Sequence, residues 1–95
     1  MNNISSLQPR LSSDSLCLIQ NPLNLRYFTE TDIDTGYLLI SNQNAYFITD
    51  FRYIESAENF FKDSSVKVIL QDNAQKQIKE IYDCENCEKL LIETE

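Results

Sequence analysis

Two short β-prone runs joined by a polar loop constrain the fold of this chain more than any other feature. The runs are Tyr37–Ile40 and Ala45–Thr49, and residues 41–44, Ser-Asn-Gln-Asn, separate them. Apolar and aromatic runs of this length, divided by a short Asn-rich loop, predict a β-hairpin. Both runs are mostly apolar, so we expect the two strands to lie in the middle of a sheet.

An amphipathic helix is predicted directly after the hairpin. Its apolar residues recur at steps of three and four, as one face of a helix requires. Asp50 precedes this stretch, and its carboxylate can accept hydrogen bonds from the first backbone N–H groups, so we expect it to cap the helix. Arg52 can reach back across the turn as an ion-pair partner or donate to carbonyls at the strand end, and the functional alternative is that it binds a peptide carboxylate. The residues of the apolar face are Tyr53, Ile54, Ala57, Phe60 and Phe61.

Three further strands and two further helices are predicted. The apolar run 16–19 is typical of a strand buried on both faces, and Asn21-Pro22 is expected to end it as a turn. Residues 66–70 and 90–92 are the other strands. Asp72 or Asn73 caps a helix between them, with Ala74, Ile78, Ile81 and Tyr82 on its inner face. A short N-terminal helix, limited by Pro9, presents Ile4, Leu7 and Leu11.

Strands and helices alternate after the hairpin, which indicates the α/β class: a mixed β-sheet of about five strands flanked by helices. The length of 95 residues suits one domain.

Composition excludes several classes of function. Fifteen acidic residues outnumber eight basic ones, for a net charge of -7, and no basic cluster exists. Nucleic acid and anionic membranes are therefore not expected as partners. The absence of histidine excludes Ser-His and Cys-His catalysis, and a single glycine, Gly36, excludes a Gly-rich phosphate loop. The apolar runs are too short for a membrane span, and no secretory signal precedes them, so we expect a cytoplasmic protein.

Three cysteines offer one alternative function. Cys84 and Cys87 form a single C-x-x-C, and Cys17 lies in an apolar run where a small buried thiol fits. A structural zinc site needs four ligands, and a thioredoxin-like pair needs the beginning of a helix. This pair follows the predicted helix, so we interpret the cysteines as incidental, with a redox or zinc role as the minor alternative.

Three segments together resemble the N-terminal domain of the creatinase/prolidase family. They are residues 24–29 (NLRYFT), 36–40 (GYLLI) and 49–57 (TDFRYIESA). The resemblance implies a ribonuclease H-like sheet, with a structural motif made by Asn24, Tyr27, Thr29, Asp50, Arg52 and Tyr53. The family's domain is longer, so residues 1–95 are expected to form one truncated domain without the catalytic C-terminal domain.

The resemblance also implies a function without chemistry in this chain. We expect a non-catalytic domain of a metal-dependent Xaa-Pro aminopeptidase or dipeptidase, serving dimerisation and shaping the substrate pocket. The parent enzyme would act on proline-containing peptides with two divalent ions (manganese, cobalt or zinc) held in the missing catalytic domain. The expected partners are a second copy and that domain. The alternative is a free-standing protein-interaction module of the same fold.

The acidic residues Glu30, Asp32 and Asp34 are candidates for the substrate-pocket or dimer loop, because in several family members this loop reaches a neighbouring subunit's active site. Here Thr29-Glu30-Thr31 replaces the family's usual Thr-Gly-Phe. A calcium loop of the EF-hand type needs Gly at its sixth and Glu at its twelfth position, and neither register provides them. A solvated acidic loop is the competing interpretation.

Overall fold

The computed structural model describes residues 4, 8–29, 33, 36–62 and 66–92. Its centre is a five-stranded mixed sheet in the order β4-β3-β2-β1-β5. The three inner strands pair antiparallel, and each outer strand lies parallel to its neighbour. The strands are β1 (Ser15–Ile19), β2 (Tyr37–Ile40), β3 (Ala45–Thr49), β4 (Val66–Leu70) and β5 (Lys89–Ile92). The α/β class and the mixed five-stranded sheet predicted from the sequence are confirmed.

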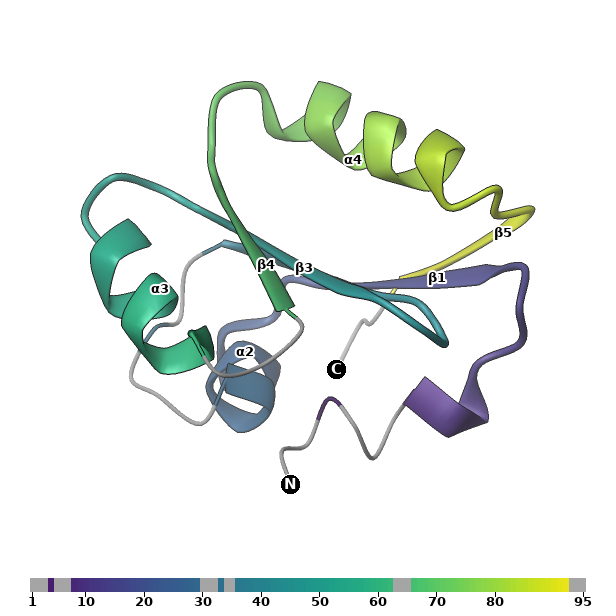
Figure 1. The fold of residues 1–95 in the computed structure, drawn as a ribbon, viewed down its shortest axis with the longest axis horizontal. Helices are drawn as coiled ribbons and strands as arrows, with labels where there is room; N and C mark the ends of the chain where they lie inside the picture. Colours follow the sequence, from purple (N-terminus) through teal and green to yellow (C-terminus); the bar gives the residue numbers. More distant parts are fainter. Residues whose placement is uncertain (1–3, 5–7, 30–32, 34–35, 63–65, 93–95) are drawn as a thin grey trace.

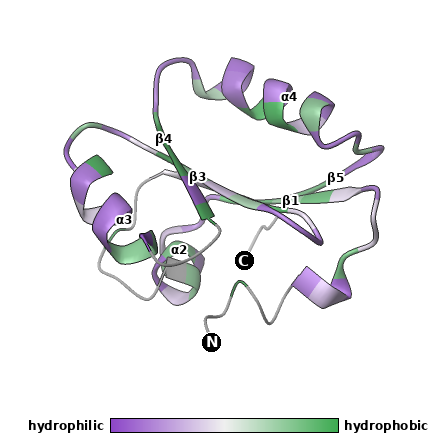
Figure 2. Cartoon of the chain, viewed as in Figure 1, coloured by the Kyte–Doolittle hydropathy of each residue, from purple (hydrophilic) through white to green (hydrophobic). Residues whose placement is uncertain are grey.

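Helices cover both faces of this sheet (Figure 1). Helix α4 (Ala74–Cys84) lies on one face, and α2 (Pro22–Thr29) and α3 (Ile54–Phe61) lie on the other, with a short 3-10 helix, η1 (Gln8–Arg10), near the N-terminus. Each helix carries hydrophilic as well as hydrophobic residues (Figure 2). The buried residues Ala57 and Phe61 of α3 and Ile81 of α4 pack in the apolar clusters on their sides of the sheet. No helix of the described residues is long and apolar enough to cross a membrane.

The sheet separates two apolar clusters. Under α2 and α3, Leu25, Leu38, Phe47 and Phe61 pack with other buried residues. Under α4, a second cluster contains Leu16, Leu18, Leu39, Tyr46, Ile48 and Ile81. The alternation of β2 and β3 residues between the two clusters explains why both strands are apolar along their whole length.

The predicted hairpin is confirmed, and its loop is held by one side chain. The amide of Ser41 donates to the carbonyl of Asn44 at 2.8 Å, and the Asn44 amide donates to Ser41 Oγ at 2.9 Å. Ser41 is buried, so its hydroxyl is satisfied by the backbone that it orders.

The turn predicted at Asn21-Pro22 is wrong, because helix α2 begins there. The amide of Leu23 donates to Asn21 Oδ1 at 2.9 Å, which is an N-cap contact. Proline suits the first helical position, where its missing N–H is not needed. The Asn-Pro pair therefore starts a helix immediately after β1.

The capping role predicted for Asp50 is also wrong. Helix α3 begins later, at Ile54, and its N-cap residue Tyr53 makes no side-chain cap bond. Asp50 instead closes the preceding turn, where its carbonyl accepts from the Tyr53 amide at 3.1 Å. The cap predicted for α4 is confirmed at Asn73, whose side chain accepts from the Lys76 amide at 3.1 Å.

The short N-terminal helix falls mostly outside the described residues. Residues 8–10 of that region form η1, and Ile4 is buried in the cluster under α2 and α3.

Candidate functional site

One end of the sheet holds the motif residues Asp50 and Arg52 together with several exposed apolar side chains. Strands β1, β3, β4 and β5 all end there, and β2 begins there, as the register pairs Thr49↔Leu70, Tyr37↔Ile48 and Ile19↔Leu38 show. We call it the strand-end surface and define it by the residues at these ends: Leu23, Asp50, Phe51, Arg52 and Leu70.

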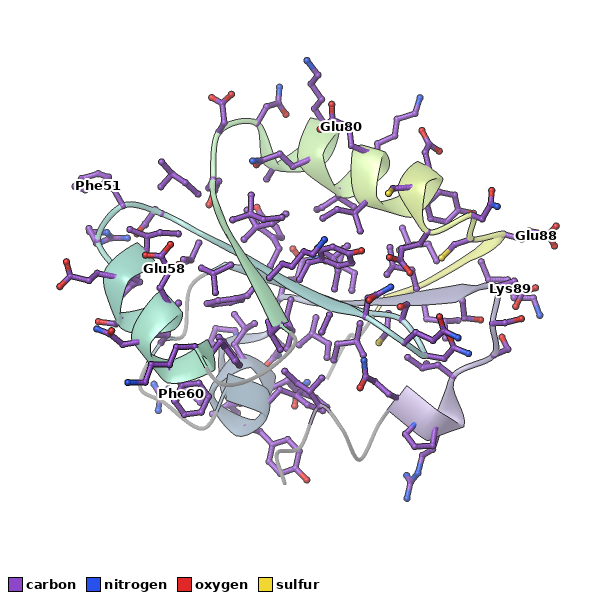
Figure 3. All side chains as sticks on the ribbon, in the orientation of Figure 1. Phe51, Glu58, Phe60, Glu80, Glu88 and Lys89 are labelled. Carbon is purple, nitrogen blue, oxygen red and sulfur yellow. The ribbon has the colours of Figure 1, made fainter. Side chains whose placement is uncertain are left out.

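The strand-end surface exposes several apolar side chains beside the Asp50–Arg52 pair. Phe51 and Leu23 expose 79% and 72% of their surface, and Leu70, the last residue of β4, exposes 53%. Phe51 points outward from the turn after β3, away from the rest of the molecule (Figure 3). Single exposed apolar residues are ordinary, but several at one end of a sheet are typical of an interaction site.

The turn after β3 is held by Asp50 and Arg52. Arg52 Nη2 and Nε donate to Asp50 Oδ2 at 2.8 and 3.2 Å, and the Arg52 amide donates to Asp50 Oδ1 at 3.0 Å. The guanidinium also lies over the Tyr53 ring, 5.2 Å from its centroid. Of the two structural roles that the sequence leaves open for Arg52, the structure shows the ion pair, with Asp50 as the partner.

These contacts keep both side chains ionised. The hydrogen bond from the Arg52 side chain is the largest cause that lowers the pKa of Asp50, and the same bond raises the pKa of Arg52. The Arg52 guanidinium therefore already donates two hydrogen bonds to a carboxylate of the same chain, that of Asp50. This arrangement favours a structural role for Arg52 over the capture of a peptide carboxylate.

Helix α2 carries the other motif residues on the same face of the sheet as α3. Tyr27 is exposed and meets Phe28 edge-to-face at 5.1 Å, and Phe28 packs on the cluster that also receives Tyr53. Asn24 Nδ2 is buried and has no hydrogen-bond partner among the described residues. Thr29 ends the helix. The loop candidates Glu30, Asp32 and Asp34 lie outside the described residues.

Two residues of the segment between α2 and β2, Ile33 and Gly36, are described and contact the rest of the domain. Ile33, within the loop, is buried in the cluster under α2 and α3. Gly36, at its end, has φ +137°, and a Cβ there would lie 2.6 Å from the Ile48 carbonyl oxygen. Only glycine tolerates both the dihedral and the close approach. Sequence analysis singles out Gly36 as the chain's one glycine and as the first residue of the family-like segment 36–40, but neither observation predicts its close approach to Ile48.

A polar network that the sequence analysis did not predict joins the hairpin to the end of α4. The Tyr46 hydroxyl donates to a carboxylate oxygen of Glu85, and Asn44 Nδ2 donates to the same oxygen at 3.1 Å. Burial and the Glu85 hydrogen bond raise the pKa of Tyr46. No motif connects these residues in the sequence, because they lie about forty positions apart and meet only through the sheet.

The cysteine pair lies in the turn that ends α4. Asn86 has φ +58°, and the amide of Cys87 donates to the Tyr82 carbonyl at 3.3 Å, as in a Schellman motif. Burial, followed by the charges of Glu85 and Asp14, raises the pKa of the Cys87 thiol. A raised pKa disfavours the reactive thiolate. In the described part of the chain, no three potential ligands come together as a metal site.

Comparison with known protein families identifies the family of this domain. The profile of the creatinase/prolidase N-terminal domain matches residues 8–94. The chain belongs to this family.

Solved structures of related proteins share the fold of this creatinase/prolidase domain. An Xaa-Pro dipeptidase from Bacillus anthracis is 25% identical, with a TM-score of 0.74 over 95% of this chain. The N-terminal domain of the cytoplasmic peptidase PepQ from Mycobacterium tuberculosis H37Rv has 22% identity and a TM-score of 0.77 over 98% of the chain, which covers 74% of that domain.

An X-Pro aminopeptidase from Thermotoga maritima MSB8 has 22% identity and a TM-score of 0.74, with 98% of this chain and 27% of that enzyme covered. This chain spans only a quarter of the length of the Bacillus anthracis dipeptidase. No functionally curated protein matches the sequence.

Proposed function

We propose that this domain is the non-catalytic N-terminal part of a cytoplasmic, metal-dependent Xaa-Pro aminopeptidase or dipeptidase. The catalytic domain would lie in polypeptide beyond these 95 residues, which would make the chain a truncated form of the family's domain. The peptidase relatives support the parent activity, since they are a dipeptidase and an aminopeptidase that act on Xaa-Pro substrates by name.

The residues present do not fit a two-metal centre. The chain has no histidine, and the described residues bring no three metal-ligating side chains together. The manganese, cobalt or zinc ions of the proposed parent enzyme would therefore be bound entirely by the catalytic domain, and this chain would contribute no ligand to them.

The observation that carries the proposal is the apolar strand-end surface. Phe51 lies exposed in the turn that the Asp50–Arg52 pair closes, and Leu23 lies exposed at the same end of the sheet, at the beginning of α2. A preorganised turn with exposed apolar anchors suits docking, because little side-chain freedom is lost on binding. We assign this surface to contact with the catalytic domain. The loop with Glu30, Asp32 and Asp34 would then shape access for proline-containing peptides.

The test is peptidase activity on an Xaa-Pro peptide with added manganese, measured on this chain and on any longer product of its gene. We expect the chain to be inert and the longer product to be active. In the longer product, Phe51→Ser should impair activity or domain docking, whereas Glu58→Ser on the exposed side of α3 should not. An inactive longer product would overturn the peptidase assignment.

A free-standing interaction module is the second candidate. One observation favours it: the matching PepQ structure is a separate N-terminal domain, so a domain of this fold exists as a folded unit by itself. The strand-end surface would then serve a partner protein. Inactivity of every gene product, combined with loss of partner binding in Phe51→Ser, would select this candidate.

A further inference from the structure

A groove between α4 and the strands β3 and β4 has walls that hydrogen bonds hold in place. Its volume is about 260 Å³, and its lining includes Tyr46, Lys67, Ile69, Gln77, Glu80 and Ile81. Gln77 Nε2 donates to the Leu70 carbonyl at 2.9 Å, and Gln77 Oε1 accepts from the Asp72 amide at 3.0 Å. The Tyr46 hydroxyl donates to Glu85. A groove with fixed walls loses little side-chain freedom when a ligand binds.

The least exposed lining residues of this groove are apolar. Tyr46 and Ile81 are buried members of the cluster under α4, and Ile69 packs against that cluster. A water molecule takes up roughly 30 Å³ of liquid volume, so the groove has room for about nine groups of that size. That number is comparable with the non-hydrogen atoms of leucine or proline. The apolar lining therefore suits one small apolar side chain.

Two opposite charges line the same groove without being paired. Lys67 belongs to β4 and Glu80 to α4, and neither makes an ion pair with the other or with any other described residue. Lys67 Nζ lies over the Tyr46 ring, 5.9 Å from its centroid. This contact leaves the N–H groups of Lys67 able to donate to an anion. Glu80 is exposed, and exposed side chains change rotamer quickly, so its carboxylate can turn toward a bound cation.

These two charges select a zwitterion as the occupant. A neutral apolar molecule would cover Lys67 and Glu80 and would cost part of the hydration of both. A simple anion would pair with Lys67 but would approach the Glu80 carboxylate in a chain with a net charge of -7. A small molecule that carries a carboxylate, an ammonium and an apolar group side by side pairs with both charges and covers the apolar lining.

We propose that this groove binds a free amino acid with an apolar side chain. The α-carboxylate of the ligand accepts from Lys67, and its α-ammonium donates to Glu80. Its side chain lies against Tyr46, Ile69 and Ile81. Exposed ion pairs are weak, so the expected Kd for L-leucine is on the order of 1 mM.

The inference goes beyond the proposed function and does not depend on it. Hydrolysis of the bond between an N-terminal residue and proline releases a free amino acid. In the proposed parent enzyme, the groove would therefore bind a reaction product, and that step alone rests on the proposed function.

Titration of the full chain with L-leucine, followed by the chemical shifts of its backbone amides, tests the proposal. We expect the amides of Ile69, Gln77 and Ile81 to shift with a common Kd. N-acetyl-L-leucine lacks the ammonium and L-leucinamide lacks the carboxylate. Each should bind about fivefold more weakly than L-leucine, because one ion pair is lost.

Variants of the two charged residues assign each end of the ligand. Lys67→Gln should weaken L-leucine binding about fivefold and remove its advantage over L-leucinamide. Glu80→Gln should do the same with respect to N-acetyl-L-leucine. Lys79→Gln is the matched control, because it removes a lysine of α4 that lines the groove on the other side of the helix, and it should leave binding unchanged. Circular dichroism verifies the fold of each variant.

Three results would overturn the proposal. The first is the absence of shifts in the groove amides at ~10 mM L-leucine, well above the expected Kd. The second is equal binding of L-leucine and either blocked analogue, which would make the groove a site for an anion, a cation or any apolar segment of a polypeptide. The third is a Lys79→Gln variant that loses as much affinity as Lys67→Gln. All three would leave the peptidase assignment standing, because that assignment is tested by activity of the longer product.

Discussion

The two carboxylate oxygens of Asp50 bind Arg52 in two ways, one through its backbone amide and the other through its guanidinium. Arg52 Nη2 lies 2.8 Å from Asp50 Oδ2, and the Arg52 amide donates to Asp50 Oδ1 at 3.0 Å. The Asp50 side chain thus accepts hydrogen bonds from both the backbone and the side chain of Arg52. The position of Phe51 between these two residues fixes an exposed aromatic ring at the strand-end surface.

This pair predicts a loss of stability in acid. The pKa of Asp50 is lowered in the folded chain, chiefly by the Arg52 side chain. A lowered pKa means that the contribution is present above the unfolded value, near 4, and is lost as pH falls through the folded value. In Asp50→Asn and Arg52→Ala, the free energy of unfolding should therefore fall less steeply as the pH is lowered below about 4. Urea unfolding at neutral pH and below pH 4 measures this, with Asp72→Asn as control; a fall that is as steep in both variants as in the unmodified chain would contradict it.

Replacing Gly36 by a residue with a side chain should destabilise the fold for steric reasons. A Cβ at this position would lie 2.6 Å from the Ile48 carbonyl oxygen, in a backbone with φ +137°. Gly36→Ala should therefore cost roughly 1–3 kcal/mol or more in the free energy of unfolding. Asn86→Gly is the control, because Asn86 holds φ +58° in open turn geometry and glycine adopts that conformation more easily. A stability of Gly36→Ala equal to that of the unmodified chain would refute the conformation.

Sequence patterns predicted the elements of this fold because the patterns are local. The hairpin, the strand 66–70 and the helix after Asn73 all follow from periodicity and turn residues within a few positions. The position of Asp50 before an apolar stripe suggested a cap, but the carboxylate competes for a tighter contact with Arg52, so the helix begins at Ile54. Local propensity does not decide between these two partners.

The site was less predictable, because it depends on pairings between distant segments. The approach of Gly36 to Ile48, and the contact of Tyr46 with Glu85, exist only once the sheet has formed. The helix at Pro22 was within reach of sequence reasoning, since an Asn cap followed by Pro at the first helical position is a known start signal. The same two residues are also common in turns, so the dipeptide by itself does not distinguish a turn from the beginning of a helix.

Tyr46 predicts a loss of stability in alkali. Its hydroxyl donates to Glu85, and its pKa is raised by burial and by that carboxylate. A raised pKa means that the contribution is complete below the unfolded value, near 10, and falls as pH rises toward the folded value. Tyr46→Phe should lower the free energy of unfolding by about 1 kcal/mol at neutral pH. The variant should also lose less stability than the unmodified chain when the pH rises above about 10. Urea unfolding at pH 8 and above pH 10 measures both effects.

Tyr82→Phe is the control for that experiment, since Tyr82 packs on the same cluster. If Tyr46→Phe and Tyr82→Phe respond alike to alkali, the assignment to the Tyr46–Glu85 contact is wrong.

Cys84 and Cys87, at the end of α4, are expected to react with alkylating agents at different rates and not to bind zinc. Cys84 is exposed, whereas Cys87 is half-buried and has a raised pKa. Iodoacetamide should therefore modify Cys84 before Cys87, because less thiolate forms at the buried site. Cys84→Ser combined with Cys87→Ser should leave the unfolding midpoint nearly unchanged and should not alter zinc content after dialysis against zinc. Faster modification of Cys87, or zinc that is retained by the unmodified chain and lost in the double variant, would instead establish a redox or metal function at the end of α4.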